Sequence, residues 1–285
     1  MDTQRQSNSQ HKTTTPSSKI KSILFRSLRI VIFVYLGLVL LAIAFEKQLV
    51  YHGTPTDSAH RYPGFEEHFI SSQDGVLLHG ISIEFPVSDK WAIFFHGNAG
   101  SLEHRVAFLK ELSFKLKRNV LAVDYRGFGK SEGSPSEDAL ISDAVDFTNY
   151  AMEHLRLRPE ECYLVGRSLG GGVALQLATE YTFEAMILIN TFTSLTDVAS
   201  ELYPFLPTQQ IMRNRFDSIL VAEQLQIPVF QTHDTQDEII PYDNGRALYD
   251  RFVTKKAFWV HEDASHNTAL PADFYRALNR FLKAL

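Results

Sequence analysis

The chain has 285 residues, of which 45% are hydrophobic and 21% are charged, and its formal net charge is -5. This length and apolar content suffice for one sizeable core, so we expect one folded domain with an appendage. The acidic balance excludes a broadly basic surface, and we expect no nucleic-acid partner. The single cysteine, Cys162, excludes an intramolecular disulfide, and its apolar neighbours indicate a buried core residue.

The first part of the chain predicts a tail followed by a membrane anchor. Residues 1–27 are rich in Ser, Thr, Gln and Lys, which favours a flexible tail because few apolar groups offset the ordering entropy. Residues 30–45 are uncharged and mostly apolar, and as a helix they would span about 24 Å of a hydrocarbon core about 30 Å thick. Since Arg29 and Lys47 can snorkel to opposite interfaces, residues 28–47 are predicted to form a transmembrane helix.

Basic residues gather on the N-terminal side of this apolar run. Only Lys47 follows it closely, whereas Lys12, Lys19, Lys21, Arg26 and Arg29 precede it. The positive-inside rule therefore predicts a cytoplasmic N-terminus and a following domain that is extracytoplasmic or lumenal. The alternative is a secretory signal cleaved after Ala44, since residues 42–44 read Ala-Ile-Ala.

From residue 69 onward, short apolar runs alternate with longer amphipathic stretches, a pattern typical of a mostly parallel sheet with helices on both faces. Residues 67–85, with a turn signal at 73–75, predict an antiparallel hairpin at the start of this sheet. The other predicted strands lie at 91–95, 120–125, 162–165, 185–189, 229–232 and 257–260, which makes eight strands in residues 48–285. Predicted helices lie at 102–117, 136–155, 169–181 and 271–285, and residues 191–226 are predicted to form a small lid.

A nucleophile motif follows the predicted strand at 162–165. Residues 166–170 read Gly-Arg-Ser-Leu-Gly, which matches G-x-S-x-G between a strand and an Ala-rich helical stretch. Glycines suit this position because larger side chains would clash at a sharp turn that presents the serine. The motif predicts that Ser168 is a catalytic nucleophile.

A second glycine-rich loop follows the predicted strand at 91–95. Residues 96–100 read His-Gly-Asn-Ala-Gly, and such small residues let the backbone approach a substrate. We expect the backbone amides of Asn98 and Leu169 to stabilise an oxyanion. His96 ends a buried strand, so we predict a structural hydrogen-bonding role for it rather than metal binding or catalysis.

The acid and the base are expected after later strands, in the order Ser, Asp, His. The loop at 233–241 offers several carboxylates, of which Asp237 is the predicted acid and Asp234 the main alternative. The loop at 261–267 offers two histidines. His266 is the predicted base because a short loop can return it toward the serine, whereas His261 directly continues its strand.

Four segments together resemble the α/β-hydrolase family, and within it the membrane-anchored fungal bud-emergence subgroup. They read FEKQLVY at 45–51, FHGNAG at 95–100, DYRGFGKS at 124–131 and GRSLGG at 166–171. Shorter similarities lie at 192–195 and 215–218. The resemblance implies an α/β-hydrolase fold with a minimal cap. Members usually carry His-Gly where this chain has His-Asp at 233–234, so the acid stays open between Asp237 and Asp234.

The resemblance implies a serine hydrolase that cleaves an ester, thioester or lipid-type acyl bond through a covalent acyl-enzyme. The expected partners are a small or lipidic acyl substrate and, through the N-terminal helix, a membrane. We expect no cofactor and no metal. A serine peptidase or amidase using the same residues and a membrane-tethered scaffold without catalysis are the alternatives.

Overall fold

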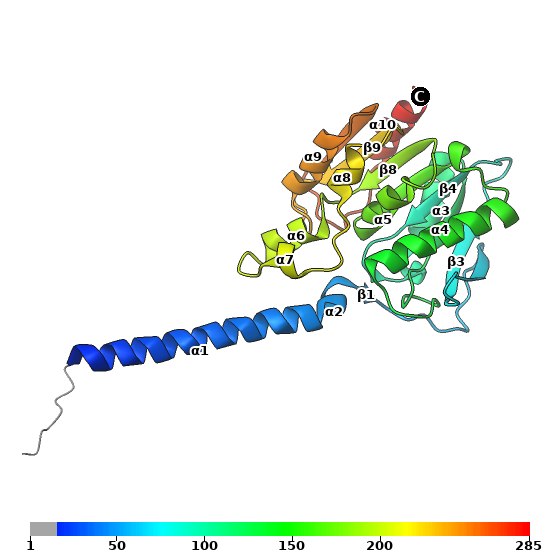
Figure 1. The fold of residues 1–285 in the computed structure, drawn as a ribbon. Helices are drawn as coiled ribbons and strands as arrows, with labels where there is room; N and C mark the ends of the chain where they lie inside the picture. The colour runs from blue at the N-terminus through cyan, green and yellow to red at the C-terminus, as the bar shows by residue number, and fades with distance from the viewer. Residues whose placement is uncertain (1–15) are drawn as a thin grey trace, which may run out of the picture. The chain divides into compact units, whose positions relative to one another are not determined.

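A computed structural model describes residues 16–285 (Figure 1). The chain divides into two compact units, and the boundary along the sequence lies between Phe45 and Glu46. The predicted flexible tail lies partly outside the described residues. The second unit begins at Glu46, not at residue 48 as the sequence suggested, because the Glu46 carboxylate is buried within it.

The first unit consists, in its described part, of helix α1 (Pro16–Ala44). Residues 16–27 are therefore helical rather than flexible, and the sequence prediction is wrong there. Proline suits the first helical turn, and the apolar Ile20, Ile23 and Leu24 interrupt the polar composition that had favoured a tail. Within the described residues, the part Lys19–Ala44 is the one helix long and apolar enough to cross a membrane, with a length of about 39 Å.

The second unit is built on a twisted sheet whose strand order is β10-β9-β8-β7-β4-β6-β3-β2. Its eight strands, counted over residues 16–285, are β2 (Glu66–Ser71), β3 (Leu77–Ile83), β4 (Trp91–Phe95), β6 (Asn119–Val123), β7 (Tyr163–Arg167), β8 (Ala185–Ile189), β9 (Val229–Asp234) and β10 (Lys256–His261). Strand β3 is antiparallel to both of its neighbours, and the remaining pairs are parallel. The predicted mostly parallel sheet with an antiparallel start is confirmed.

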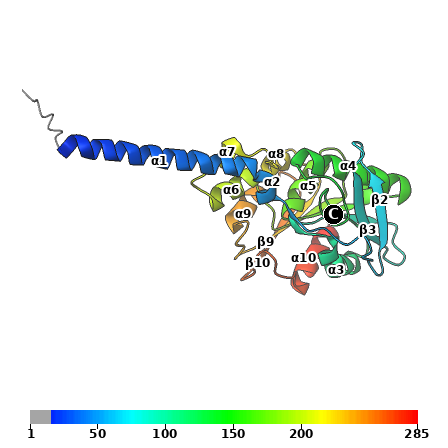
Figure 2. The same ribbon diagram turned by 90° about the horizontal axis from the view of Figure 1, so that it is seen from below.

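Helices cover both faces of this sheet (Figure 2). One face carries α3 (Val106–Leu116) and α10 (Ala272–Leu282), and the other carries α4 (Glu137–His154), α5 (Leu169–Leu177), α8 (Ser218–Ala222) and α9 (Tyr242–Arg251). Each face has its own core, because successive residues of a strand point to opposite sides. In β4, Phe94 packs in the core with Leu112 of α3, whereas Phe95 belongs to the core that contains Phe147 of α4.

Shorter elements complete the unit. They are α2 (Glu46–Val50), β1 (His52–Gly53), β5 (Ala99–Gly100), η1 (Leu102–Arg105), η2 (Pro159–Glu161), α6 (Leu195–Leu202) and α7 (Thr208–Ile211). The predicted helix at 102–117 is divided into η1 and α3, and the predicted lid at 191–226 holds α6, α7 and α8. Cys162 is buried as predicted, and burial raises the pKa of its thiol to about 12, so the thiol stays protonated.

Candidate active site

Ser168 occupies a sharp turn between β7 and α5. Its φ of 53° and ψ of -122° form a conformation that a residue with a side chain rarely adopts. The flanking glycines are required by space: a Cβ on Gly166 would lie 2.5 Å from the Gly170 carbonyl oxygen, and a Cβ on Gly170 would lie 2.0 Å from the Phe95 carbonyl oxygen. The turn is held by Thr191, whose hydroxyl donates to the Ser168 carbonyl at 3.0 Å. The sequence therefore fixes a strained serine at the carboxyl end of a central strand.

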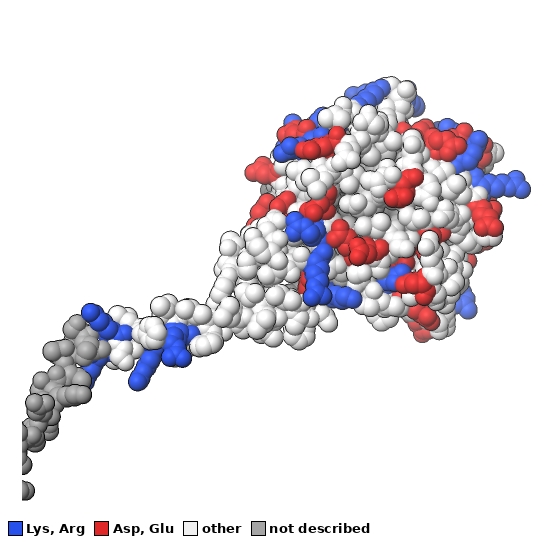
Figure 3. Space-filling view, viewed as in Figure 1, with Lys and Arg blue, Asp and Glu red and all other residues white. Residues whose placement is uncertain are grey.

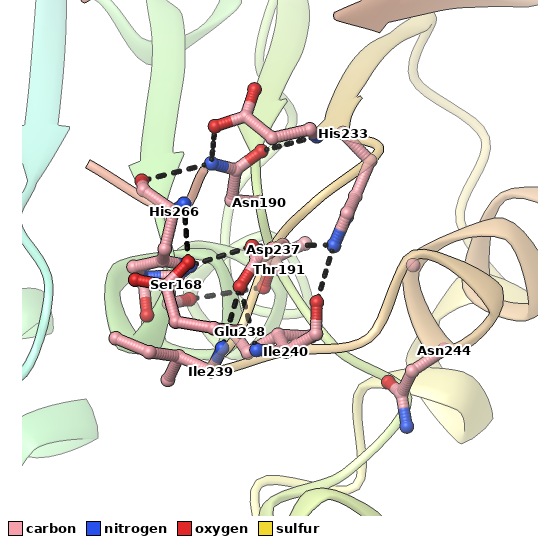
Figure 4. A network of polar contacts seen from close by, with 12 residues as sticks. Ser168, Asn190, Thr191, His233, Asp237, Glu238, Ile239, Ile240, Asn244 and His266 are labelled. Atoms are coloured by element: carbon pink, nitrogen blue, oxygen red, sulfur yellow. Dashed lines mark hydrogen bonds and ion pairs between the residues drawn. The ribbon is translucent and has the colours of Figure 1, made fainter. Parts of the chain in front are cut away.

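Asp237 and His266 are brought together beside this serine (Figure 4). His266 Nδ1 lies 2.6 Å from Asp237 Oδ2, and both side chains are buried. The other carboxylate oxygen of Asp237 accepts the backbone amides of Ile239 at 2.9 Å and Ile240 at 2.8 Å. These three contacts fix the carboxylate. A proton on Nδ1 of His266 then leaves Nε2 free to accept another proton.

The two rival residues contact each other instead. Asp234 Oδ1 lies 2.8 Å from His261 Nδ1, and Asp234 Oδ2 accepts the Asn190 side-chain amide at 2.7 Å. The same amide nitrogen of Asn190 also donates to the His266 carbonyl at 3.0 Å. The second carboxylate–histidine pair thus braces the loop that carries His266.

Three further residues contact this loop: Glu238, one of the carboxylates at 233–241, and Arg167 and Asn190, which the sequence did not single out. Arg167 donates from Nη2 to the His266 carbonyl at 2.9 Å, and the Glu238 carboxylate accepts the His266 backbone amide at 3.2 Å. Asn190 follows β8 with a φ of 48°, which brings its amide back over the strand ends. The only sequence signals for Arg167 and Asn190 were the variable position of G-x-S-x-G and a polar residue directly after a buried strand.

A second histidine approaches Asp237. His233 Nε2 lies 3.5 Å from Asp237 Oδ2 and 2.8 Å from the Ile240 carbonyl, to which it donates. Burial lowers the pKa of His233, so its ring is neutral at pH 7. A neutral His233 does not offset the negative charge of Asp237. The Asp237 carboxylate can therefore stabilise a protonated His266.

The predicted oxyanion loop lies next to the serine. A Cβ on Gly97 would lie 3.4 Å from Ser168 Cβ, which shows how closely the backbone approaches. Leu169 begins α5 directly after Ser168. Ser168, Asn98 and Leu169 all line one cavity of about 410 Å³. Its other lining residues are Leu49, Val50, His52, Ala99, Phe192, Leu195, Val198, Ala199, Leu202, Tyr203, Met212, Ile239 and Ile240.

His96 is fully buried below this loop, with Nδ1 2.7 Å from the Gly97 carbonyl. Over residues 16–285, no group of His, Cys, Asp or Glu is arranged to hold a metal ion. Burial lowers the pKa of His96 from 6.5 to about 4.

This shift predicts acid sensitivity of the fold. Between pH 6.5 and 4 the unfolded chain binds a proton at His96 that the folded chain excludes, so the contribution of His96 to stability is present above pH 6.5 and lost toward pH 4. The shift corresponds to about 3 kcal/mol of unfolding free energy. We expect the free energy of unfolding, measured by urea titration, to fall less between pH 8 and pH 4.5 in His96→Asn than in the wild type. Equal losses in both proteins would contradict the prediction.

The chain belongs to the α/β-hydrolase family. A family profile described as "alpha/beta hydrolase fold" matches residues 91–218, which run from β4 to the start of α8. The relatives match its bud-emergence-type subgroup. The chain is 29% identical to Protein bem46 of Schizosaccharomyces pombe, covering 93% of this chain and 96% of that protein. It is 33% identical to the alpha/beta hydrolase domain-containing protein WAV2 of Arabidopsis thaliana, covering 76% and 79% of the two chains.

Other comparisons add lipase and esterase neighbours. The chain is 34% identical to the lysophosphatidylserine lipase ABHD12 of Danio rerio over 62% of this chain and 51% of that protein. Among solved structures, an esterase of Pyrococcus furiosus superposes with a TM-score of 0.66 at 22% identity, covering 81% of this chain and 98% of that one. The structural likeness shows the fold, and the family and its relatives together support a hydrolase.

Proposed function

We propose that the protein is a serine hydrolase that cleaves an ester-type acyl bond, with Ser168 as nucleophile, His266 as base and Asp237 as the acid that orients the histidine. The observation that carries this proposal is the 2.6 Å contact between His266 and a fixed Asp237 carboxylate beside a serine in a strained turn.

In the proposed reaction Ser168 Oγ attacks the substrate carbonyl carbon while His266 Nε2 takes the hydroxyl proton. The backbone amides of Asn98 and Leu169 stabilise the negative oxygen. The bond to the leaving alcohol then breaks, and the alcohol takes the proton from His266. Water attacks the acyl-enzyme in the same way, which releases the carboxylic acid and restores Ser168.

The cavity beside Ser168 supports an acyl chain as the substrate group. Its lining is mostly aliphatic and aromatic, and its exposed residues include Leu49, Leu202 and Tyr203. In the face shown in Figure 3, the surface over α6 and α7 carries few charged side chains. Helix α1 is compatible with a membrane anchor, which would hold the enzyme where lipidic esters are concentrated. We further propose that the N-terminus is cytoplasmic, on the asymmetry of its basic residues.

We expect kcat/KM for p-nitrophenyl esters to rise about tenfold or more from acetate to octanoate, because each buried methylene contributes about 0.8 kcal/mol. Ala199→Trp, which reduces the cavity, should lower the octanoate rate far more than the acetate rate. Initial-rate measurements check both expectations. A flat chain-length profile in the wild type would contradict an acyl-chain site.

Two alternatives are separated by simple substrates. A peptidase or amidase would hydrolyse the p-nitroanilide of octanoic acid at a rate comparable to the ester. A scaffold without catalysis would hydrolyse neither and would not react with a fluorophosphonate probe. We expect ester hydrolysis well above anilide hydrolysis, together with probe labelling.

A further inference from the structure

Residues 46–56, here called the arm, connect α1 to the sheet and lie against the oxyanion loop. The backbone amide of His52 donates to the Asn98 carbonyl at 2.9 Å, and the Asn98 side-chain amide donates to the Val50 carbonyl at 2.9 Å. The short strands β1 and β5 then pair in parallel register. Thr54 continues this contact by donating to the Gly100 carbonyl at 3.1 Å. Asn98 is thus tied to the arm through both its backbone and its side chain.

The N-terminal end of the arm is fixed by a buried carboxylate. Glu46 is 7% exposed, and its Oε1 accepts the backbone amides of Arg213 at 2.9 Å and Asn214 at 2.8 Å. It also accepts the Asn214 side-chain amide at 2.9 Å. Asn214 Oδ1 accepts in turn from the Tyr51 hydroxyl at 2.8 Å. Burial raises the pKa of Tyr51, so this hydroxyl stays a donor.

These contacts hold the arm in one position. A buried carboxylate is costly unless its hydrogen bonds are satisfied, so displacement of Glu46 from its three donors is unfavourable. Between Glu46 and the Asn98 contacts, the chain forms only the short helix α2 and Tyr51. A shift of Glu46 would therefore also displace Asn98, whose backbone amide is proposed to bind the oxyanion.

We propose that Glu46 is a positioning residue for the oxyanion hole, acting through the arm on Asn98. This inference rests on the proposed serine-hydrolase function. In this proposal the arm helps to set the geometry of the active site and is not merely a linker. Because an oxyanion donor acts on the transition state more than on the bound substrate, disturbing it should lower kcat with little change in KM.

The test uses the full chain in detergent and the variants Glu46→Ala, Glu46→Gln and Lys47→Ala. Lys47 is the matched control, because it is the next residue of α2 and its ammonium donates to the exposed Ser134 hydroxyl at 3.3 Å. The measurements are kcat and KM for the octanoyl ester, and Ki for an octyl trifluoromethyl ketone, which forms a tetrahedral oxyanion adduct with a serine nucleophile. We expect Glu46→Ala to lower kcat about 10–100-fold, to keep KM within about threefold, and to weaken ketone binding in parallel.

Glu46→Gln keeps the Oε1 acceptor and should restore most of kcat, and Lys47→Ala should match the wild type. Unchanged kcat in Glu46→Ala, or unchanged ketone affinity, would overturn the inference. If Glu46→Ala does not fold, Tyr51→Phe takes its place: a parallel loss of kcat and ketone affinity supports the inference, and unchanged values overturn it. A wild type that neither hydrolyses the ester nor labels with a fluorophosphonate refutes the proposed function itself, which separates the two failures.

Discussion

Ser168→Ala is expected to lower kcat for the octanoyl ester by at least about 10⁴-fold and to abolish fluorophosphonate labelling. The substitution removes the atom that would form the acyl-enzyme, and only substrate binding and oxyanion stabilisation remain. The backbone of the turn is held by Thr191 and by the backbone bond from Ser168 to the Ile189 carbonyl, neither of which uses the Ser168 side chain. The variant should therefore fold, which circular dichroism and thermal unfolding can check.

Ser265→Ala is the matched control for this loss. Ser265 lies in the loop that carries His266, but its side chain is exposed and contacts only Thr268 at 3.3 Å. Its rate should stay within about threefold of the wild type. A folded Ser168→Ala protein with more than a few per cent of wild-type activity would show that another group is the nucleophile.

Asp237→Asn should lower kcat about 10³–10⁴-fold while preserving the shape of the site. The amide that replaces the carboxylate would present a donor to His266 Nδ1, which favours the tautomer with its proton on Nε2 and removes the stabilisation of imidazolium. Asp234→Asn removes one carboxylate of the same local sequence. It contacts His261 and Asn190 rather than His266, and we expect a loss within about tenfold.

Initial rates of the two variants at pH 7.5 decide between the carboxylates. A large loss in Asp234→Asn together with a small loss in Asp237→Asn would assign the acid role to Asp234. Similar losses in both variants would indicate that the contact of Asn190 with Asp234 matters as much as the contact of Asp237 with His266. That result would contradict the proposed roles.

The parts of the fold that were predicted well depend on local patterns. The strand Trp91–Phe95 and the G-x-S-x-G turn each follow from a short apolar run and the glycines after it, and the structure has both where the sequence places them. Asp237 and His266 were predicted as a pair with Asp234 left as the alternative acid, but the local sequence could not decide between the two carboxylates or reveal the contact of Asp234 with His261. The pairing depends on how two loops from neighbouring strands meet, and either pairing is compatible with the same local sequence.

Long-range polar contacts account for most of what was missed. Arg167 and Asn190 reach the His266 carbonyl across large separations in sequence, and no local pattern marks an arginine or an asparagine for such a contact. Glu46 was predicted to lie within the membrane helix at 28–47 because it adjoins an apolar run. Its role in the second unit depends on backbone amides of Arg213 and Asn214, which lie far away in the sequence.

The order of the strands also determines when the site is completed during synthesis. The turn with Ser168 precedes β8, β9 and β10 along the chain, whereas His266 follows β10, which comes latest in sequence among the strands of this sheet and forms one of its edges. A nascent chain that has folded its N-terminal strands first would expose a serine turn without its proposed base. Catalysis would then begin only when β10 and α10 have joined the sheet, so a chain truncated before residue 266 would be inactive even if most of its core had formed.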